Sequence, residues 1–297
     1  MSEKTLIKSI LVTAVSPMSD HAANRGEKLL GNASSVKRRP DGRVYISGQM
    51  QRHVLFSAIE RLNDNSDTYV ANGDAPSTDI EKDLRSDLGG FMDTNKGDYS
   101  GRRIAPISAT PAVAANESSV GRDLLVRLKM NTDSDSNKKQ ALTLNEFSED
   151  DSMIMNFHID VGAVGVVKEF TYEKEYHVST QYNFKIDDSE HRRRIGLFLE
   201  ATGSMTDFAN QARNAVSGEP SDVLIILDTK MSRKAVRYFK ELTSATMREN
   251  ILKELKMRGA LVFEGDDSTS EGMSVADAYA AAMKAVKENE LYRPKND

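Results

Sequence analysis

The chain has 297 residues, a net charge of −5, 39% apolar and 6% aromatic residues, and neither cysteine nor tryptophan. The absence of cysteine excludes disulfides, zinc–cysteine sites, iron–sulfur clusters and a thiol nucleophile, and it suits a reducing compartment. No apolar stretch approaches the length that spans a membrane, and the charged N-terminus leads straight into a strand-like run, without a signal peptide. We therefore expect a cytoplasmic protein with no membrane partner and a mainly aliphatic core.

Charge is unevenly distributed along the chain. A net negative charge argues against a general nucleic-acid binder, because such domains are often basic. Basic residues nevertheless gather in three places, which are Lys37–Arg39 with Arg43, Arg102–Arg103, and Arg192–Arg194. We expect a basic track on an otherwise acidic body, and we interpret Arg192–Arg194 as the exposed side of a helix or a subunit contact.

The predicted elements begin with a strand over Leu6–Ser16 that ends at Pro17, followed by a long polar connection from Met18 to Arg39. Thr78 and Glu81 fit a capping box for a short helix that stops at Gly89–Gly90. Strands are predicted over Ile104–Val113, Asp123–Lys129, Met153–Asp160, Val223–Leu227 and Leu261–Phe263, helices over Asp188–Thr202, Arg248–Met257 and Ser274–Asn289, and disorder over Asn131–Gln140.

An aromatic run with a strict period of two occupies Glu169–Lys185. Its apolar residues all fall on even positions, which are Phe170, Tyr172, Tyr176, Val178, Tyr182 and Phe184. Such alternation predicts a two-stranded ribbon with one aromatic face, turning within Lys174–Ser179. We interpret the aromatic run as sheet core in preference to a platform for stacked bases. Since strands and helices are mixed without regular alternation, the fold class is α+β with an antiparallel sheet.

A strand, a tight turn and a helix follow one another over Arg43–Leu62. Ser47 is a natural N-cap, because its hydroxyl can accept a hydrogen bond from a free backbone N–H of the first turn. Gln49, Arg52 and His53 lie on the polar face of the predicted helix. A helix start offers free N–H groups and a partial positive charge, so the turn can hold a phosphodiester without reading a base.

The order of these motifs resembles the backbone subunit of type I CRISPR surveillance complexes, the seventh Cas family, in its DevR or negative-autoregulator branch. The resemblance rests on Asn24–Arg25, the basic loop, Ile46–His53, Asp160–Gly165, the helix with His191–Arg194 that ends at Gly203, and Asn210–Arg213 before Val223–Leu227. It covers the chain from the N-terminus to about Leu227. Gly48 departs from the pattern, because some relatives carry a second hydroxyl there.

The resemblance implies one RNA-binding domain over residues 1–297. Its palm is a modified RNA-recognition-motif or ferredoxin-like fold, with a finger insertion over about 64–150 and a β-ribbon thumb over about 163–186. It implies a non-catalytic subunit without cofactor or metal, which binds CRISPR guide RNA and stacks head to tail with other copies. Other type I Cas subunits and, through the guide, target DNA are the further partners.

Candidate RNA contacts follow from the resemblance together with the charge pattern. They are Asn24, Arg25, Lys37, Arg38, Arg39, Ser47, Gln49, Arg52, His53, Arg102 and Arg103. Two other functions remain open. One is a metal-dependent RNA-cleaving backbone subunit of the type III class, for which Asp20 and Glu27 lie in a suitable loop. The other is a general α+β interaction or regulatory protein.

Overall fold

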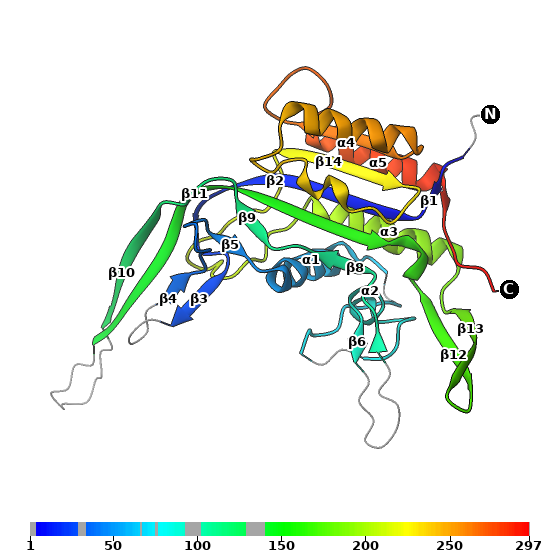
Figure 1. Ribbon diagram of the computed structural model, residues 1–297. Helices are drawn as coiled ribbons and strands as arrows, with labels where there is room; N and C mark the ends of the chain where they lie inside the picture. Colours follow the sequence, from blue (N-terminus) through cyan, green and yellow to red (C-terminus); the bar gives the residue numbers. More distant parts are fainter. Residues whose placement is uncertain are drawn as a thin grey trace, which may run out of the picture.

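A computed structural model describes residues 4–28, 34–65, 67–74, 77–92, 102–128 and 140–296. The predicted disordered segment Asn131–Gln140 lies almost wholly outside these residues. The fold combines one large sheet with a few helices, so the expected mixture of α and β structure is confirmed (Figure 1). Strand pairs within the large sheet are antiparallel, except for the pair of β4 with β11.

The large sheet is built around two long strands, β2 (Ser9–His21) and β11 (Gln140–Asp160). Its order is β15–β14–β2–β11–β4–β3, and β8, β9 and β10 also pair with β11. The other members are β3 (Arg25–Lys28), β4 (Ser34–Val36), β5 (Tyr45–Ile46), β8 (Ile107–Ala109), β9 (Ala112–Ala114), β10 (Val120–Leu128), β14 (Asp222–Asp228) and β15 (Leu261–Asp266). Small sheets join β1 (Leu6–Ile7) to β16 (Glu290–Leu291), and β6 (Phe91–Met92) to β7 (Arg102–Arg103).

Helices cover both faces of the sheet. The main core lies between the sheet and α1 (Gly48–Leu62), α3 (Asp188–Thr202) and α5 (Val275–Glu288). On the sheet side, Met153, Met155, Phe157 and Ile159 of β11 are all at most 1% exposed. The residues between them are buried as well, so the half-buried strand predicted from alternation over Met153–Asp160 is in fact covered on both faces. A smaller core on the opposite face packs α4 (Ala245–Met257) and the short 3-10 helix η2 (Lys234–Arg237) against β2 and β14.

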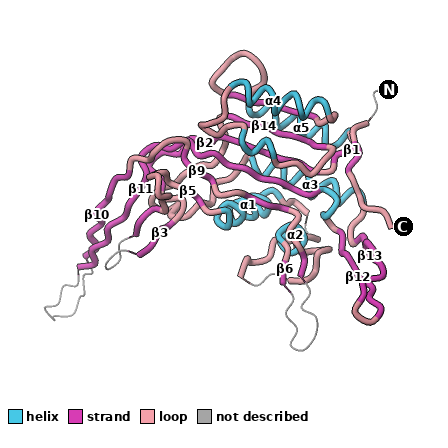
Figure 2. Tube along the Cα trace, viewed as in Figure 1, coloured by secondary structure: helices cyan, strands magenta, loops and turns pink. Residues whose placement is uncertain are grey.

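Three projections extend from this body (Figure 1). One is formed by the outer ends of β10 and β11, and a second contains α2 (Leu84–Gly89), β6 and β7. The third is the hairpin of β12 (Val166–Glu173) and β13 (Tyr176–Phe184), called the ribbon below, which follows the 3-10 helix η1 (Val161–Ala163). The first and third consist of strand and turn in their described residues, while the long helices stay with the body (Figure 2). The range expected for the finger insertion, 64–150, includes β8 and β9 of the large sheet.

Local signals located several elements correctly. Helix α3 has the predicted bounds, and the Ser274–Asp277 capping box forms at the start of α5. The ribbon turns at Lys174–Glu175, inside the predicted range. Each of these features depends on residues near one another in the chain.

Three local predictions were wrong. Strand β2 continues through Pro17, which pairs with Ser152 of β11. On its other side, β14 pairs with β2 only as far as Val15. Pro17 therefore lies at a free edge of β2, where its missing N–H is tolerated. The expected loop between Met18 and Arg39 contains the end of β2 and strands β3 and β4. Helix α2 begins later than expected, because Asp83 caps it by accepting from the Arg85 amide at 2.9 Å.

Candidate nucleic-acid interface

The turn between β5 and α1 has the geometry predicted for it. Ser47 is the N-cap, with φ −61° and ψ 150°, and its Oγ accepts from the backbone N–H of Met50 at 3.2 Å. A Cβ added at Gly48 would lie 2.9 Å from the carbonyl oxygen of Ala109. Position 48 therefore has no room for the hydroxyl-bearing side chain that some relatives carry. At this position the turn therefore consists of backbone alone.

Three polar side chains follow the turn on α1, and they differ in exposure. Gln49 and His53 are exposed. Arg52 is half-buried and donates from Nη2 to the carbonyl oxygen of Gly89 at 2.6 Å, while burial lowers the pKa of its guanidinium. The first turn of α1 contains no acidic residue, so its partial positive charge is not opposed from within the helix. The helix start can therefore accept an anion.

The adjacent Asn24 and Arg25 have separate roles within the chain. Asn24 is buried, and its Nδ2 donates to the carbonyl oxygen of Tyr45 at 3.1 Å, which ties the end of β2 to β5. Arg25 is exposed, and its Nε donates to Oδ1 of Asn210 at 2.8 Å. Asn210 in turn donates from Nδ2 to the carbonyl oxygen of Ala22 at 2.8 Å. Asn210 therefore holds Arg25 in place, a contact the sequence did not reveal although Asn210 belongs to a motif of the resemblance.

The basic loop is partly neutralised by its neighbours. Arg38 lies 3.3 Å from Oε2 of the buried Glu146, and Arg39 lies 3.8 Å from Oδ2 of Asp41. Lys37 is half-buried, and its backbone pairs with Asn24 and Tyr45. The loop therefore presents exposed guanidinium groups beside the Ser47 turn with less net charge than the sequence suggests.

A groove with a volume of about 450 Å³ lies beside the turn. Pro111, which lines it, belongs to the segment that packs against Gly48. The cationic side chains among its lining residues are Arg39, Arg43 and Lys240. The lining also includes Glu241 and apolar side chains such as Val236 and Leu242, so the groove runs from the loop toward the connection between η2 and α4 with mixed character.

Comparison with known proteins places the chain in a family. Residues 18–215 match the sequence model of the family described as "CRISPR-associated negative auto-regulator DevR/Csa2". The chain belongs to this family. All candidate contacts lie within the matched range, as does Asn210. No curated protein matches the sequence.

Solved structures share the fold of the whole chain. One titled "CRISPR RNA-guided surveillance complex" has a TM-score of 0.56 and 13% identity, and the match covers 97% of this chain and 95% of the other. Another, titled "CRISPR RNA-guided surveillance complex, pre-nicking", has a TM-score of 0.54 and 13% identity, with 97% and 96% covered. The shared fold thus extends beyond the range matched by the DevR/Csa2 family.

The basic cluster Arg102–Arg103 has one exposed member and one that faces the interior. Arg102 is exposed on β7, whereas Arg103 points inward and donates to Asp87, Ala163 and Val166. Burial lowers the pKa of Arg103, and the charge of Asp87 opposes this. Because these bonds use Nε and both terminal nitrogens of Arg103, we assign its side chain to the interior of the fold.

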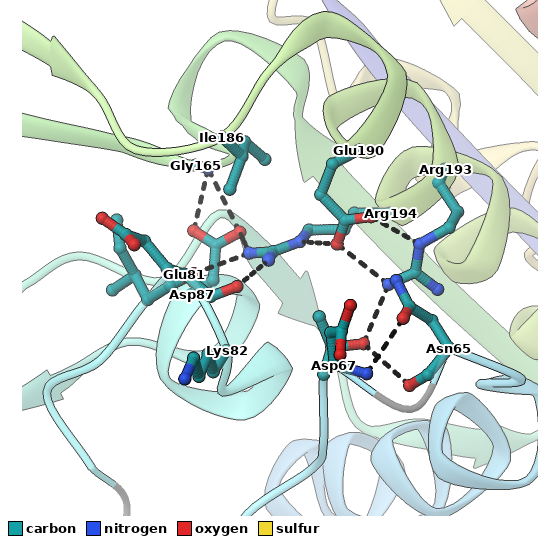
Figure 3. A network of polar contacts seen from close by, with 12 residues as sticks. Asn65, Asp67, Glu81, Lys82, Asp87, Gly165, Ile186, Glu190, Arg193 and Arg194 are labelled. Carbon is teal, nitrogen blue, oxygen red and sulfur yellow. Dashed lines mark hydrogen bonds and ion pairs between the residues drawn. The ribbon is translucent and has the colours of Figure 1, made fainter.

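The expectation that Arg192–Arg194 form an exposed face was wrong, because Arg192 and Arg193 are half-buried and bonded within the chain, and Arg194 is fully buried. Its side chain is 0% exposed and lies 2.7 Å from Oδ2 of the equally buried Asp87 (Figure 3). Its Nε also donates to Oε1 of Glu190 at 2.6 Å. Burial raises the pKa of Glu190, but hydrogen bonds from Arg193 and Arg194 outweigh it and hold the pKa below its ordinary value. Three consecutive arginines on a helix point in different directions, so one of them can enter the core.

The two carboxylates considered for metal-dependent cleavage lie on β2 and β3, which follow one another in the chain but are separated in the sheet by β11 and β4. Asp20 is exposed near the end of β2 with a positive φ of 48°, and Glu27 is exposed on β3. Within the described ranges, no three histidine, aspartate or glutamate side chains are grouped so that they could hold a metal ion. No helix in the described part of the chain is long and apolar enough to cross a membrane.

Proposed function

We propose that this chain is a non-catalytic backbone subunit of a type I CRISPR surveillance complex and binds guide RNA along its sugar–phosphate chain. Membership of the DevR/Csa2 family and the fold shared with surveillance-complex chains support this class of function. The observation that carries the RNA contact is the Ser47 turn, where α1 begins with a capped first turn, an exposed Gln49 and no acidic residue. Contacts to phosphates position a strand and leave its bases free to pair with target DNA.

The same proposal assigns roles to the larger parts of the fold. The large sheet with α1 and α3 is the modified RNA-recognition-motif palm, and the ribbon is the thumb. The ribbon and the basic loop lie at opposite ends of the body in Figure 1. A head-to-tail stack therefore brings the ribbon of one copy toward the RNA on the next, alongside other type I Cas subunits. A preparation that is free of nucleic acid and monomeric at high concentration would favour a general interaction protein instead.

The phosphate contacts predict a change in the salt dependence of RNA binding. Each of Arg25→Ala and Arg52→Ala should flatten the slope of log affinity against log salt by about 0.7, because one fewer phosphate is neutralised on a single strand. The measurement is a titration of single-stranded RNA across a salt series. Arg61→Ala is the matched control, since Arg61 lies at the far end of α1 and pairs with Asp207. Unchanged salt slopes in both test variants would show that neither Arg25 nor Arg52 contacts a phosphate.

The non-catalytic role predicts that the assembled complex leaves complementary RNA intact in the presence of Mg²⁺. The reason is that the helix start binds phosphate through backbone N–H groups, which supply neither a nucleophile nor a general base. The measurement is incubation with labelled RNA followed by separation of fragments by length. Periodic cuts that disappear in Asp20→Ala or Glu27→Ala would instead establish the metal-dependent enzyme.

A further inference from the structure

The base of the ribbon is joined to distant parts of the chain by a buried ionic cluster, called the Asp87 cluster. It consists of Asp87, Arg103, Glu190 and Arg194. The Asp87 carboxylate accepts from the Arg194 guanidinium at 2.7 Å and from the backbone N–H of Gly165 at 2.9 Å, and it also pairs with Arg103. Figure 3 shows Asp87 between Gly165 and Arg194. Since Gly165 directly precedes β12, this carboxylate contacts the root of the ribbon.

Arg103 contacts the same root from another side. Its Nη2 donates to the carbonyl oxygen of Ala163 at 2.9 Å, and its Nη1 donates to that of Val166. Its Nε donates to the Asp87 carbonyl oxygen at 2.9 Å. One side chain thus links β7, α2 and both ends of the short segment that leads into β12. Because two buried cations share one carboxylate, removing a member leaves an uncompensated charge or an unpaired donor.

The C-terminal segment holds the other strand of the ribbon. Asn296 exchanges two hydrogen bonds with the backbone of Tyr182, at 2.7 and 3.1 Å. Arg293 donates to the carbonyl oxygens of Ile186 and Asp187 at 3.0 and 2.9 Å, and its guanidinium lies 5.1 Å from the centre of the Phe184 ring. These contacts fix the end of β13 to residues about a hundred positions further along the chain.

The faces of the ribbon contribute little to its orientation. Most of its side chains beyond Val167 are exposed, including Phe170 at 48% and Tyr176 at 76%. A two-stranded hairpin without a packed face is only marginally stable by itself. Its direction relative to the body must therefore be set at its root, where the Asp87 cluster and the C-terminal segment both bind.

We propose that Asp87, Arg103, Arg293 and Asn296 are positioning residues that fix the direction of the ribbon and so set how one copy engages RNA held by the next. The second part of this inference rests on the proposed function; the first part does not. None of the four needs to touch RNA. Their loss should weaken cooperative binding along a strand and leave the number of phosphates contacted by each copy unchanged.

The direction of the ribbon can be measured in the isolated chain without RNA. Because the chain has no cysteine, Glu175→Cys at the ribbon turn and Lys253→Cys on α4 accept two spin labels without further changes. The unaltered chain should give one narrow distribution of label distances. Arg103→Gln and, separately, Arg293→Ala with Asn296→Ala should lose that narrow peak and give a broad distribution.

Arg258→Gln is the matched control for general destabilisation. Arg258 pairs with buried Asp228 at the opposite face of the sheet, away from the ribbon, and should leave the peak narrow. If Arg103→Gln does not fold, the test rests on the double variant Arg293→Ala with Asn296→Ala. This variant should fold, because Asn296 is exposed. A narrow peak in every folded test variant would overturn the positioning role and would leave the proposed function standing.

RNA binding provides the second measurement. The test variants should lose the gain in affinity that the unaltered chain shows as the RNA is lengthened, while the salt slope for each bound copy stays the same. A reduced salt slope would contradict the inference, because it would make these residues phosphate contacts. If the unaltered chain binds no RNA but the distance peak broadens as expected, the proposed function fails and the positioning role holds.

Discussion

Ser47 caps α1, and the proposed function gives the same turn a binding role. Its hydroxyl accepts from the Met50 amide and so satisfies one of the free donors of α1. The backbone of Gly48 packs too closely on Ala109 to admit a side chain. In the proposed function, the remaining N–H groups of the first turn bind a phosphate of the RNA. A substitution at Ser47 should change stability and RNA binding together.

Ser47→Ala should lower the free energy of unfolding by about 0.5–2 kcal/mol, because it removes an N-cap acceptor. Ser274→Ala, which breaks the capping box of α5, should have a stability effect of the same size. Urea denaturation measures both. Only Ser47→Ala should also weaken binding of single-stranded RNA. Equal RNA affinity in the two variants would show that the Ser47 turn is a cap and nothing more.

Whether an arginine of this chain is exposed or buried depends on the side chains that the fold brings next to it. Arg25 is exposed beside Asn210, whereas Arg194 is fully buried against Asp87. Arg194 belongs to a basic run and Arg25 does not, yet the arginine in the run is the buried one. Since a buried guanidinium needs a carboxylate that the fold brings to it, its location depends on a residue far away in the chain.

At the scale of elements, the ribbon is the part with the most exposed aromatic surface. Phe170 and Tyr172 lie on the face that also contains His177, whose ring is 5.9 Å from each of theirs. The register shift between Thr171 and Tyr172 moves Tyr176 opposite Glu173 and off this face. The interpretation of the whole run as sheet core was wrong, because both strands project away from the body.

Phe170→Ala and Tyr172→Ala should each leave the free energy of unfolding within about 0.5 kcal/mol of the unaltered chain, as expected for exposed positions. Each should weaken RNA binding in the assembled complex by about 1–3 kcal/mol, the contribution of one aromatic stacked on a base. Calorimetric unfolding and RNA titration measure the two effects. Met257→Ala on α4, where Met257 is 79% exposed, is the control. Normal RNA affinity in both ribbon variants would exclude base stacking.

At the scale of the whole molecule, folding buries His158 on β11 and His191 on α3. Burial lowers the pKa of His158 and of His191 from 6.5 to about 4. For His191, a hydrogen bond to the Val161 carbonyl oxygen at 2.8 Å partly opposes the effect of burial. The folded state must therefore exclude protons that the unfolded chain binds at mildly acidic pH.

Stability should decline as the pH falls from about 6.5 to about 4. In that window the unfolded histidines are protonated and the folded ones are not, so the free energy of unfolding decreases by up to about 3 kcal/mol for each histidine. Below about pH 4 the histidine contribution levels off, and carboxylates such as Glu190 then lose their favourable pairing. Urea denaturation across pH measures the decline. His158→Gln should lessen the loss between pH 6.5 and 4; an identical decline in this variant would contradict the assignment.

Much of the fold and part of the site followed from local sequence. Capping residues located α1 and α5, the spacing of apolar residues located α3, and alternation located the ribbon. The Ser47 turn was predicted in the same way, since the capping hydroxyl and the Met50 N–H that donates to it lie three residues apart. Such features need only neighbours within a few positions, which a single sequence displays.

The tertiary structure alone decided which polar residues face inward and where strands continue. Pro17 remains in β2 because β11 lies alongside it, Arg103 and Arg194 enter the core because Asp87 meets them there, and Asn210 reaches Arg25 across the chain. Each of these outcomes joins residues separated by tens to hundreds of positions. The sequence by itself thus determined the family, many of the local elements and the capped turn at Ser47. The long-range pairing that balances buried charge determined which basic side chains remain at the surface, because no pattern of neighbours encodes that pairing.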